Sequence, residues 1–139
     1  MLKHCVMAMG LLIASAGQAQ TVLGLSDGTT LLRFPAEAPG VLLANTPVTG
    51  LAAGESLLGI DVRPATGEVY ALSDGGRLYR IDPASGAATL ASTLNTALSG
   101  TRFAVDFNPV PDRLRVISDS GQNLRINVDT GETIVDGAI

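Results

Sequence analysis

The stretch SDGGRLYRIDPASG, Ser73–Gly86, has a close counterpart in SDSGQNLRINVDTG, Ser118–Gly131. A looser copy, SDGTTLLRFPAEAPG, lies at Ser26–Gly40. Residues 58–94 and 103–139 align without a gap at a constant offset of 45, and eight aligned pairs are identical. A fixed period of about 20 to 50 residues is typical of stacked supersecondary units. The sequence therefore predicts a repeat architecture.

Each repeat divides into four short segments with strand-like alternation, separated by turn residues. In the central copy, Asp-Gly-Gly at 74–76 favours a primed hairpin turn, and Pro64 with Gly67 marks another turn. Four antiparallel strands in about 45 residues is the pattern of one β-propeller blade. The N-terminal copy lacks a first strand. We therefore predict an all-β chain of β-propeller-like blades, with about eleven strands, or about two and three-quarter blades, in an incomplete ring.

The N-terminus has the pattern of a secretory signal peptide. Lys3 and His4 are followed by an apolar run, Val6–Ala16, and by small residues before Ala19. The apolar run is too short for the roughly 20 residues that span a bilayer. We therefore expect a signal peptide at 1–19, a folded domain at 20–139, and a secreted or periplasmic protein without a membrane span.

Composition excludes several kinds of chemistry. The only Lys, His and Cys lie before Ala19, so the mature chain has no imidazole base, thiolate or Schiff-base lysine. Zinc prefers His or Cys ligands, which leaves oxygen-ligated calcium as the metal to consider. The full sequence has a net charge of −4, which argues against nucleic acid as a partner.

Several stretches resemble a secreted bacterial family known as domain of unknown function 4394. The resemblance covers essentially the whole mature chain and implies an architecture and a secreted location, with no catalytic residues to carry over. Members of that family are typically longer, so we expect a truncated member. The stretches are LLGIDVRPATGEVYAL, GRLYRIDPASGAAT, LSGTRFAVDFNP and, most distinctive, DRLRVISDSGQNLRINVDTG.

Four charged residues recur at equivalent repeat positions. Asp61 and Asp106 lie on the first strand of their repeats, and Arg80 and Arg125 lie on the third. One interpretation is a ring of inward carboxylates with arginine partners that clamps a polar ligand. The other is that each Asp caps its Pro turn or pairs with the Arg of its own blade. We favour the structural role, because a residue repeated in every blade usually serves the blade.

Asp74 and Asp119 lie in the turns between the second and third strands, and Asp27 is the third copy. Carboxylates on neighbouring loops suit calcium, although the Asp-x-Asp-x-Asp spacing of an EF-hand is absent. Aspartate also suits a turn because it tolerates left-handed geometry. We favour the turn role and keep Asp74 and Asp119 as candidates for ligand binding.

Polar residues that occur in only one repeat are better site candidates than repeated ones. Gln122 and Asn123 replace Arg77 and Leu78 of the central copy, and Arg102 precedes the first strand of the last copy. Because these side chains are not needed to build every blade, we add them to the candidate ligand-binding residues. Exposed polar residues on a hairpin are the ordinary alternative.

The sequence favours a secreted, non-enzymatic binding or scaffold module of unidentified ligand. The alternative is a calcium-dependent propeller-type hydrolase, in which the metal activates water. Fewer than three blades cannot close a ring. We therefore expect either several copies that complete one ring or a truncated piece of a longer product.

Overall fold

The computed structural model describes residues 20–139, and the predicted signal peptide lies outside the described residues. Residues 20–139 form eleven strands and no helix, arranged in antiparallel sheets of three, four and four strands. The prediction of an all-β chain with a three-stranded N-terminal unit is therefore confirmed. This part of the chain contains no helix that could cross a membrane.

The N-terminal sheet has the strand order β1-β2-β3. The turn between β1 and β2 places Asp27 at φ 53° and Gly28 at φ 67°, the positive angles that a primed hairpin turn requires. The Thr29 N–H donates to the Ser26 carbonyl across this turn at 3.2 Å. The strands are β1 (Thr21–Ser26), β2 (Thr30–Pro35) and β3 (Ala44–Pro47).

The central and C-terminal sheets share one strand order. Each runs from its first strand to its fourth without a crossover, as β4-β5-β6-β7 and β8-β9-β10-β11. The central strands are β4 (Leu57–Val62), β5 (Val69–Ser73), β6 (Arg77–Ile81) and β7 (Ala88–Thr93). The C-terminal strands are β8 (Phe103–Asn108), β9 (Arg113–Ser118), β10 (Asn123–Ile126) and β11 (Thr133–Val135).

The turn between β5 and β6 differs from the predicted primed turn. The Gly76 N–H donates to the Ser73 carbonyl at 3.0 Å, and Gly76 alone in this turn has a positive φ, of 69°. This is the three-residue hairpin in which a type I turn is followed by a left-handed glycine. Gly121 takes the same place between β9 and β10, with φ 82°. The left-handed position in both turns therefore belongs to glycine, and Asp74 and Asp119 do not use it.

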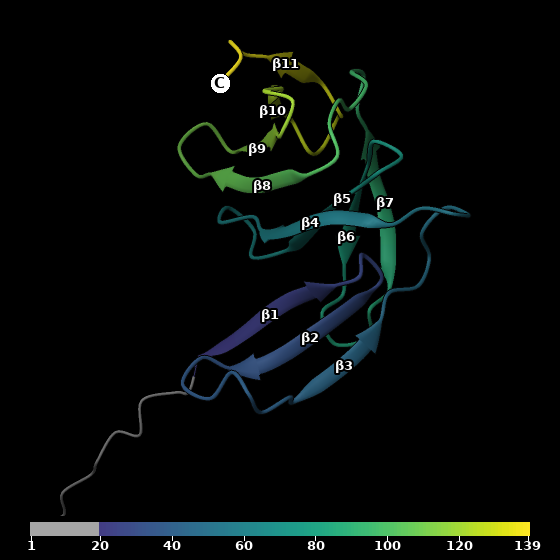
Figure 1. Ribbon diagram of the computed structural model, residues 1–139, viewed down its shortest axis with the longest axis vertical. Helices are drawn as coiled ribbons and strands as arrows, with labels where there is room; N and C mark the ends of the chain where they lie inside the picture. Colours follow the sequence, from purple (N-terminus) through teal and green to yellow (C-terminus); the bar gives the residue numbers. More distant parts are fainter. Residues whose placement is uncertain (1–19) are drawn as a thin grey trace, which may run out of the picture.

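The central and C-terminal sheets pack through β4 and β8, which run side by side (Figure 1). Gly59 on β4 lets β8 approach closely, because a Cβ built there would lie 2.6 Å from Val105 Cγ2. The rings of Tyr70 and Phe107 meet edge to face with centroids 5.7 Å apart. The cluster between the sheets also includes fully buried Leu72, Leu78, Leu114, Val116, Leu124, Ile126 and Val128.

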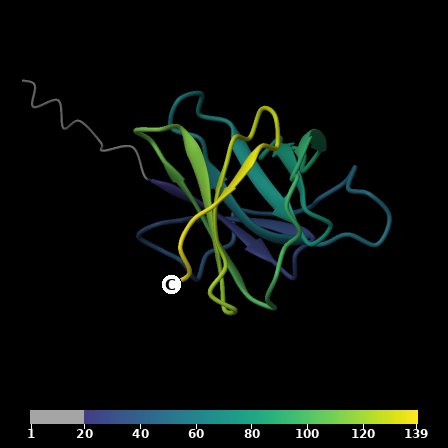
Figure 2. The same cartoon turned by 90° about the horizontal axis from the view of Figure 1, so that it is seen from above.

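A smaller cluster lies between the N-terminal and central sheets. Leu31 of β2 is buried there among residues of β5 and β6, including Val69, Tyr79 and Ile81. Seen from above, the strands of the C-terminal sheet lie in front of those of the other two, so the three sheets follow one another along the long axis (Figure 2). The central sheet is thus covered on both faces.

The connections between sheets repeat one contact. After β3, Thr49 donates its N–H to the Gly86 carbonyl at 3.0 Å and accepts the Ala88 N–H at 2.8 Å. After β7, Asn95 takes the same place beside the start of β11, where its side-chain Oδ1 accepts the Thr133 N–H at 3.1 Å. The connection that leaves one sheet therefore runs along the outer strand of the next.

Candidate functional site

A cleft of about 430 Å³ lies where the turn between β5 and β6 faces the connection from β7 to β8. The turn contributes residues 74–76 and the connection contributes residues 94–98. One predicted ligand-binding residue, Asp74, lines this cleft. The other wall carries the side chains of Asn95 and Thr96, with Leu94 and Leu98 as its apolar part.

Asp74 is held at the cleft by its own sheet. Its N–H donates to the Ser56 carbonyl at 2.9 Å, and its Oδ1 accepts the Ser56 N–H at 3.1 Å. These two bonds fix the start of β4 against the turn. Within residues 20–139, the second carboxylate oxygen, Oδ2, takes no hydrogen bond. Asp74 therefore presents a positioned and exposed acceptor to the cleft.

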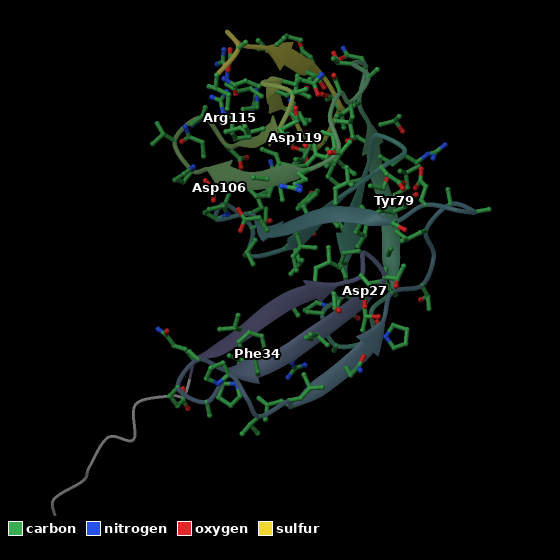
Figure 3. The ribbon with its side chains drawn as sticks, in the orientation of Figure 1. Asp27, Phe34, Tyr79, Asp106, Arg115 and Asp119 are labelled. Atoms are coloured by element: carbon green, nitrogen blue, oxygen red, sulfur yellow. The ribbon has the colours of Figure 1, made fainter. Side chains whose placement is uncertain are left out.

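Asp119 holds the matching corner of the C-terminal sheet with a fully used carboxylate. Its Oδ2 accepts the Thr101 hydroxyl at 2.6 Å, and its Oδ1 accepts the N–H groups of Thr101 at 2.8 Å and Arg102 at 3.2 Å. The bond from the Thr101 hydroxyl, with those from the backbone, lowers the pKa of Asp119 below its usual value. Asp119 and Asp27 lie well apart along the long axis, so the three turn aspartates do not converge (Figure 3).

Gln122 and Asn123 hold loops in place in this structure. Gln122 Oε1 accepts the Ser99 N–H and its Nε2 donates to the Ala97 carbonyl, both at 2.9 Å. These bonds fix the connection that forms one wall of the cleft. Asn123 Oδ1 accepts from Arg115 Nη1 at 2.6 Å. Gln122 and Asn123 both line a second, smaller cavity of about 290 Å³ beyond β10. Arg102 is exposed.

The four charged residues at repeated positions do not form equivalent contacts in the two sheets. Asp61 Oδ2 accepts the Phe107 N–H at 2.7 Å, a bond to the next sheet where we expected a partner in its own repeat. Asp106, at the equivalent place on β8, is exposed (Figure 3). Arg80 pairs with Glu68 at 3.4 Å across exposed side chains. Arg125 binds both oxygens of Asp136 at 2.7 and 2.8 Å.

Arg63 joins the central and C-terminal sheets, and sequence reasoning missed it. Its guanidinium binds Asp112 at 2.6 Å and Asp129 at 2.9 Å, and its side chain is only 11% exposed. The hydrogen bonds to Asp112 and Asp129 raise the pKa of Arg63, and the bond from Arg63 lowers that of Asp112. The position 45 residues later is Asn108, so this mismatch between the repeats was the available signal.

A second cluster that the sequence did not reveal surrounds Glu55, whose side chain is 7% exposed. Tyr79 donates its hydroxyl to Glu55 Oε2 at 2.7 Å, and Arg77 binds Oε1. Burial pushes the pKa of Glu55 upward, but these hydrogen bonds outweigh it and leave the pKa lowered. Burial also raises the pKa of Tyr79. All three groups are satisfied by one another, so the cluster fixes the loop before β4.

A calcium site needs several converging oxygen ligands. Within residues 20–139, no three or more His, Cys, Asp or Glu side chains are grouped so that they would hold a metal ion. Asp112 and Asp136 lie instead in arginine pairs, and Asp119 holds a turn.

A comparison with protein families matches residues 30–139 to a domain of unknown function, DUF4394. The match covers most of the chain, and the protein belongs to this family. A comparison with curated proteins finds no match. The family match confirms the resemblance to domain of unknown function 4394 that the sequence indicated.

Proposed function

We propose that this member of the DUF4394 family is a secreted, non-enzymatic binding module whose sheets are blades of a β-propeller-like stack. Support for the stack comes from the shared strand order of the central and C-terminal sheets and from the adjacent first strands, β4 and β8. Secretion rests on the signal peptide predicted at residues 1–19.

The cleft beside Asp74 is the proposed binding site. Its polar groups are a carboxylate oxygen left free by the Ser56 bonds, the amide of Asn95 and the hydroxyl of Thr96. Gly75 and Gly76 bring the backbone of the turn to the same surface. Donors and acceptors are mixed here without an opposing cation among the lining residues, which suits a ligand rich in hydroxyl groups. We propose a glycan or another cell-wall polyol.

A binding role fits the side chains better than a catalytic one. Residues 20–139 contain no Lys, His or Cys, so this part of the chain has no imidazole base, thiolate or amine nucleophile. Glu55, whose side chain is 7% exposed, is paired with Arg77 and Tyr79. The single observation that carries the proposal is the positioned Asp74 oxygen in the cleft of about 430 Å³.

Retention on insoluble glycans and cell-wall fractions tests this function. The full chain should be retained on at least one fraction, and Asp74→Asn should reduce retention at least about tenfold, the size of one lost charge-assisted hydrogen bond. Asp27→Asn changes the same Ser-Asp-Gly sequence in a turn outside the cleft and should leave retention unchanged. No retention across the panel, or equal loss in both variants, would contradict the proposal.

A further inference from the structure

Within the described residues, 20–139, the strand β1 has a free edge. In the N-terminal sheet β1 pairs only with β2, whereas β5 and β9, which hold the matching places in the other sheets, are flanked on both sides. In the central sheet β4 lies beside β5, and in the C-terminal sheet β8 lies beside β9. Residues 20–139 provide no corresponding strand beside β1. Figure 1 shows β1 at the boundary with the central sheet.

The hydrogen-bonding groups along this edge are set by the pairing of β1 with β2. The Ala36 N–H donates to the Gln20 carbonyl at 2.8 Å, and this bond fixes the phase of the ladder. Because bonded residues alternate in an antiparallel pair, the backbone N–H and C=O groups of Thr21, Leu23 and Leu25 face away from β2. Three residues of β1 thus present the groups that another strand would pair with.

A backbone donor on β4 faces the same space. The Arg63 N–H donates to the Glu68 carbonyl at 2.9 Å, so by alternation the Val62 N–H points away from β5. Phe107 is the residue on β8 that matches Val62, and its N–H is taken by Asp61 of the preceding sheet at 2.7 Å. Residues 20–139 provide no such aspartate for Val62, because in this part of the chain the N-terminal sheet has no first strand.

An apolar cavity completes the boundary. It has a volume of about 290 Å³ and is lined by Thr21, Leu23, Arg33, Val62, Val69 and Pro83. Val62 is 47% exposed, whereas Phe107 at the matching place on β8 is 5% exposed. The ring of Phe107 packs edge to face on Tyr70 of β5, whereas the smaller Val62 lines the cavity together with Leu23 of β1.

We propose that the edge of β1 binds an extended peptide segment of the pattern small residue, β-branched residue, aspartate. The segment pairs with Thr21, Leu23 and Leu25, and its aspartate accepts the Val62 N–H. The occupied interface supplies this chemistry, since β4 carries Gly59-Ile60-Asp61 and β8 carries Ala104-Val105-Asp106. Strand addition gives affinity through main-chain bonds and specificity through alternate side chains.

The test is titration of the full chain with the peptide TRFAVDFNP, the sequence of residues 101–109. We expect one peptide to bind per chain and a peptide with alanine at the aspartate to bind at least about tenfold more weakly. The variant Val62→Pro removes the N–H on a side that β5 does not use and should weaken binding similarly. Val62→Ala keeps the N–H and serves as its matched control.

Three results would overturn the inference. One is the absence of binding, and another is equal affinity for the aspartate and alanine peptides, which needs no variant protein. The third is a dimer through the β1 edge that the peptide does not dissociate, measured by sedimentation velocity, because the occupant would then be a second copy. Glycan retention by the Asp74 cleft is unaffected by any of these results.

Discussion

The two interfaces between sheets differ in how completely they are closed. Between the central and C-terminal sheets, β4 and β8 pack side by side, Asp61 binds the Phe107 N–H, and Arg63 reaches two carboxylates. Between the N-terminal and central sheets residues 20–139 provide no first strand, and a cavity of about 290 Å³ lies at this boundary. The first strand of the central sheet and the residue after it therefore supply contacts that the other interface lacks within residues 20–139.

The two interfaces nevertheless share the contact at their outer strands. Gly86 packs against the carbonyl of Pro47, and Gly131 packs against that of Thr93, both with positive φ. A Cβ would lie 2.2 Å from the first carbonyl oxygen and 2.0 Å from the second. Both interfaces thus have the glycine contact at their outer strands. They differ in the contacts made by the first strand.

The largest effect is expected from a side chain at the outer contact of the closed interface. Gly131→Ala should lower the free energy of unfolding by about 3 to 5 kcal/mol, since φ strain and overpacking add. Gly86→Ala should cost less, because the N-terminal sheet has room to shift toward the cavity. Urea denaturation measures both, with Gly137→Ala, whose Cβ meets nothing within 4 Å, as control. A larger loss for Gly86→Ala would contradict the comparison.

Core truncation should separate the two clusters next. Leu124 and Leu31 are 0% and 1% exposed, one in each cluster. We expect Leu124→Ala to cost about 3 to 4 kcal/mol and Leu31→Ala about 2 to 3 kcal/mol. The reason is that Leu23 and Val69, which pack in the Leu31 cluster, line the open cavity, so that this cluster collapses more easily than the closed one. Equal losses in urea denaturation would show that the cavity does not soften its surroundings.

Removal of the Arg63 clamp is expected to have an intermediate effect. Arg63→Ala should cost about 1 to 2 kcal/mol, a value reduced because Asp112 and Asp129 are 30% and 57% exposed. Arg63→Lys keeps the charge but loses the two-pronged geometry and should fall in between. The exposed pair of Arg80 serves as control, with a loss below about 0.5 kcal/mol for Arg80→Ala. Indistinguishable losses for Arg63→Ala and Arg80→Ala would contradict a stabilising role of the Arg63 ion pairs.

The smallest effect is a pH dependence at the outer edge of the C-terminal sheet. The hydrogen bonds from Arg125 and Arg115 lower the pKa of Asp136 to about 2 from an ordinary 3.8. Because the folded-state pKa is depressed, the stabilisation is complete above about pH 4 and is lost as the pH falls to about 2. Asp136→Asn should therefore show a shallower fall of Tm over this range. Parallel Tm curves for the two proteins would contradict the assignment.

The order of strands was accessible to sequence reasoning because it depends on local signals. Alternation in segments such as LLGIDV and turn residues such as Gly67 located the eleven strands and the missing first strand. The type of the β5–β6 turn was predicted wrongly. Asp-Gly-Gly can adopt left-handed angles at more than one position. The structure places them at Gly76, the third residue of the turn, and the sequence alone does not decide this.

The side-chain clusters were less accessible because they depend on contacts distant in the sequence. Arg63 and Asp129 are 66 residues apart, and each occurs in only one repeat. Glu55, Arg77 and Tyr79 are replaced by Gly100, Gln122 and Leu124, so alignment of the repeats hid them as differences. Asp74 was predicted correctly as a turn residue. Its position in a cleft could not be predicted, because the other wall of the cleft is the distant connection at 94–98.

Amide hydrogen exchange in the native state tests the difference between the interfaces most directly. The N–H groups of Leu23 and Val62 face the free edge, whereas those of Tyr70 and Phe107 at the matching places are bonded. We predict exchange at Leu23 and Val62 at least roughly 100-fold faster than at Tyr70 and Phe107, with Gly24, which faces β2, protected on the same strand. Equal protection at all four positions would mean that the β1 edge is already covered and would contradict the account.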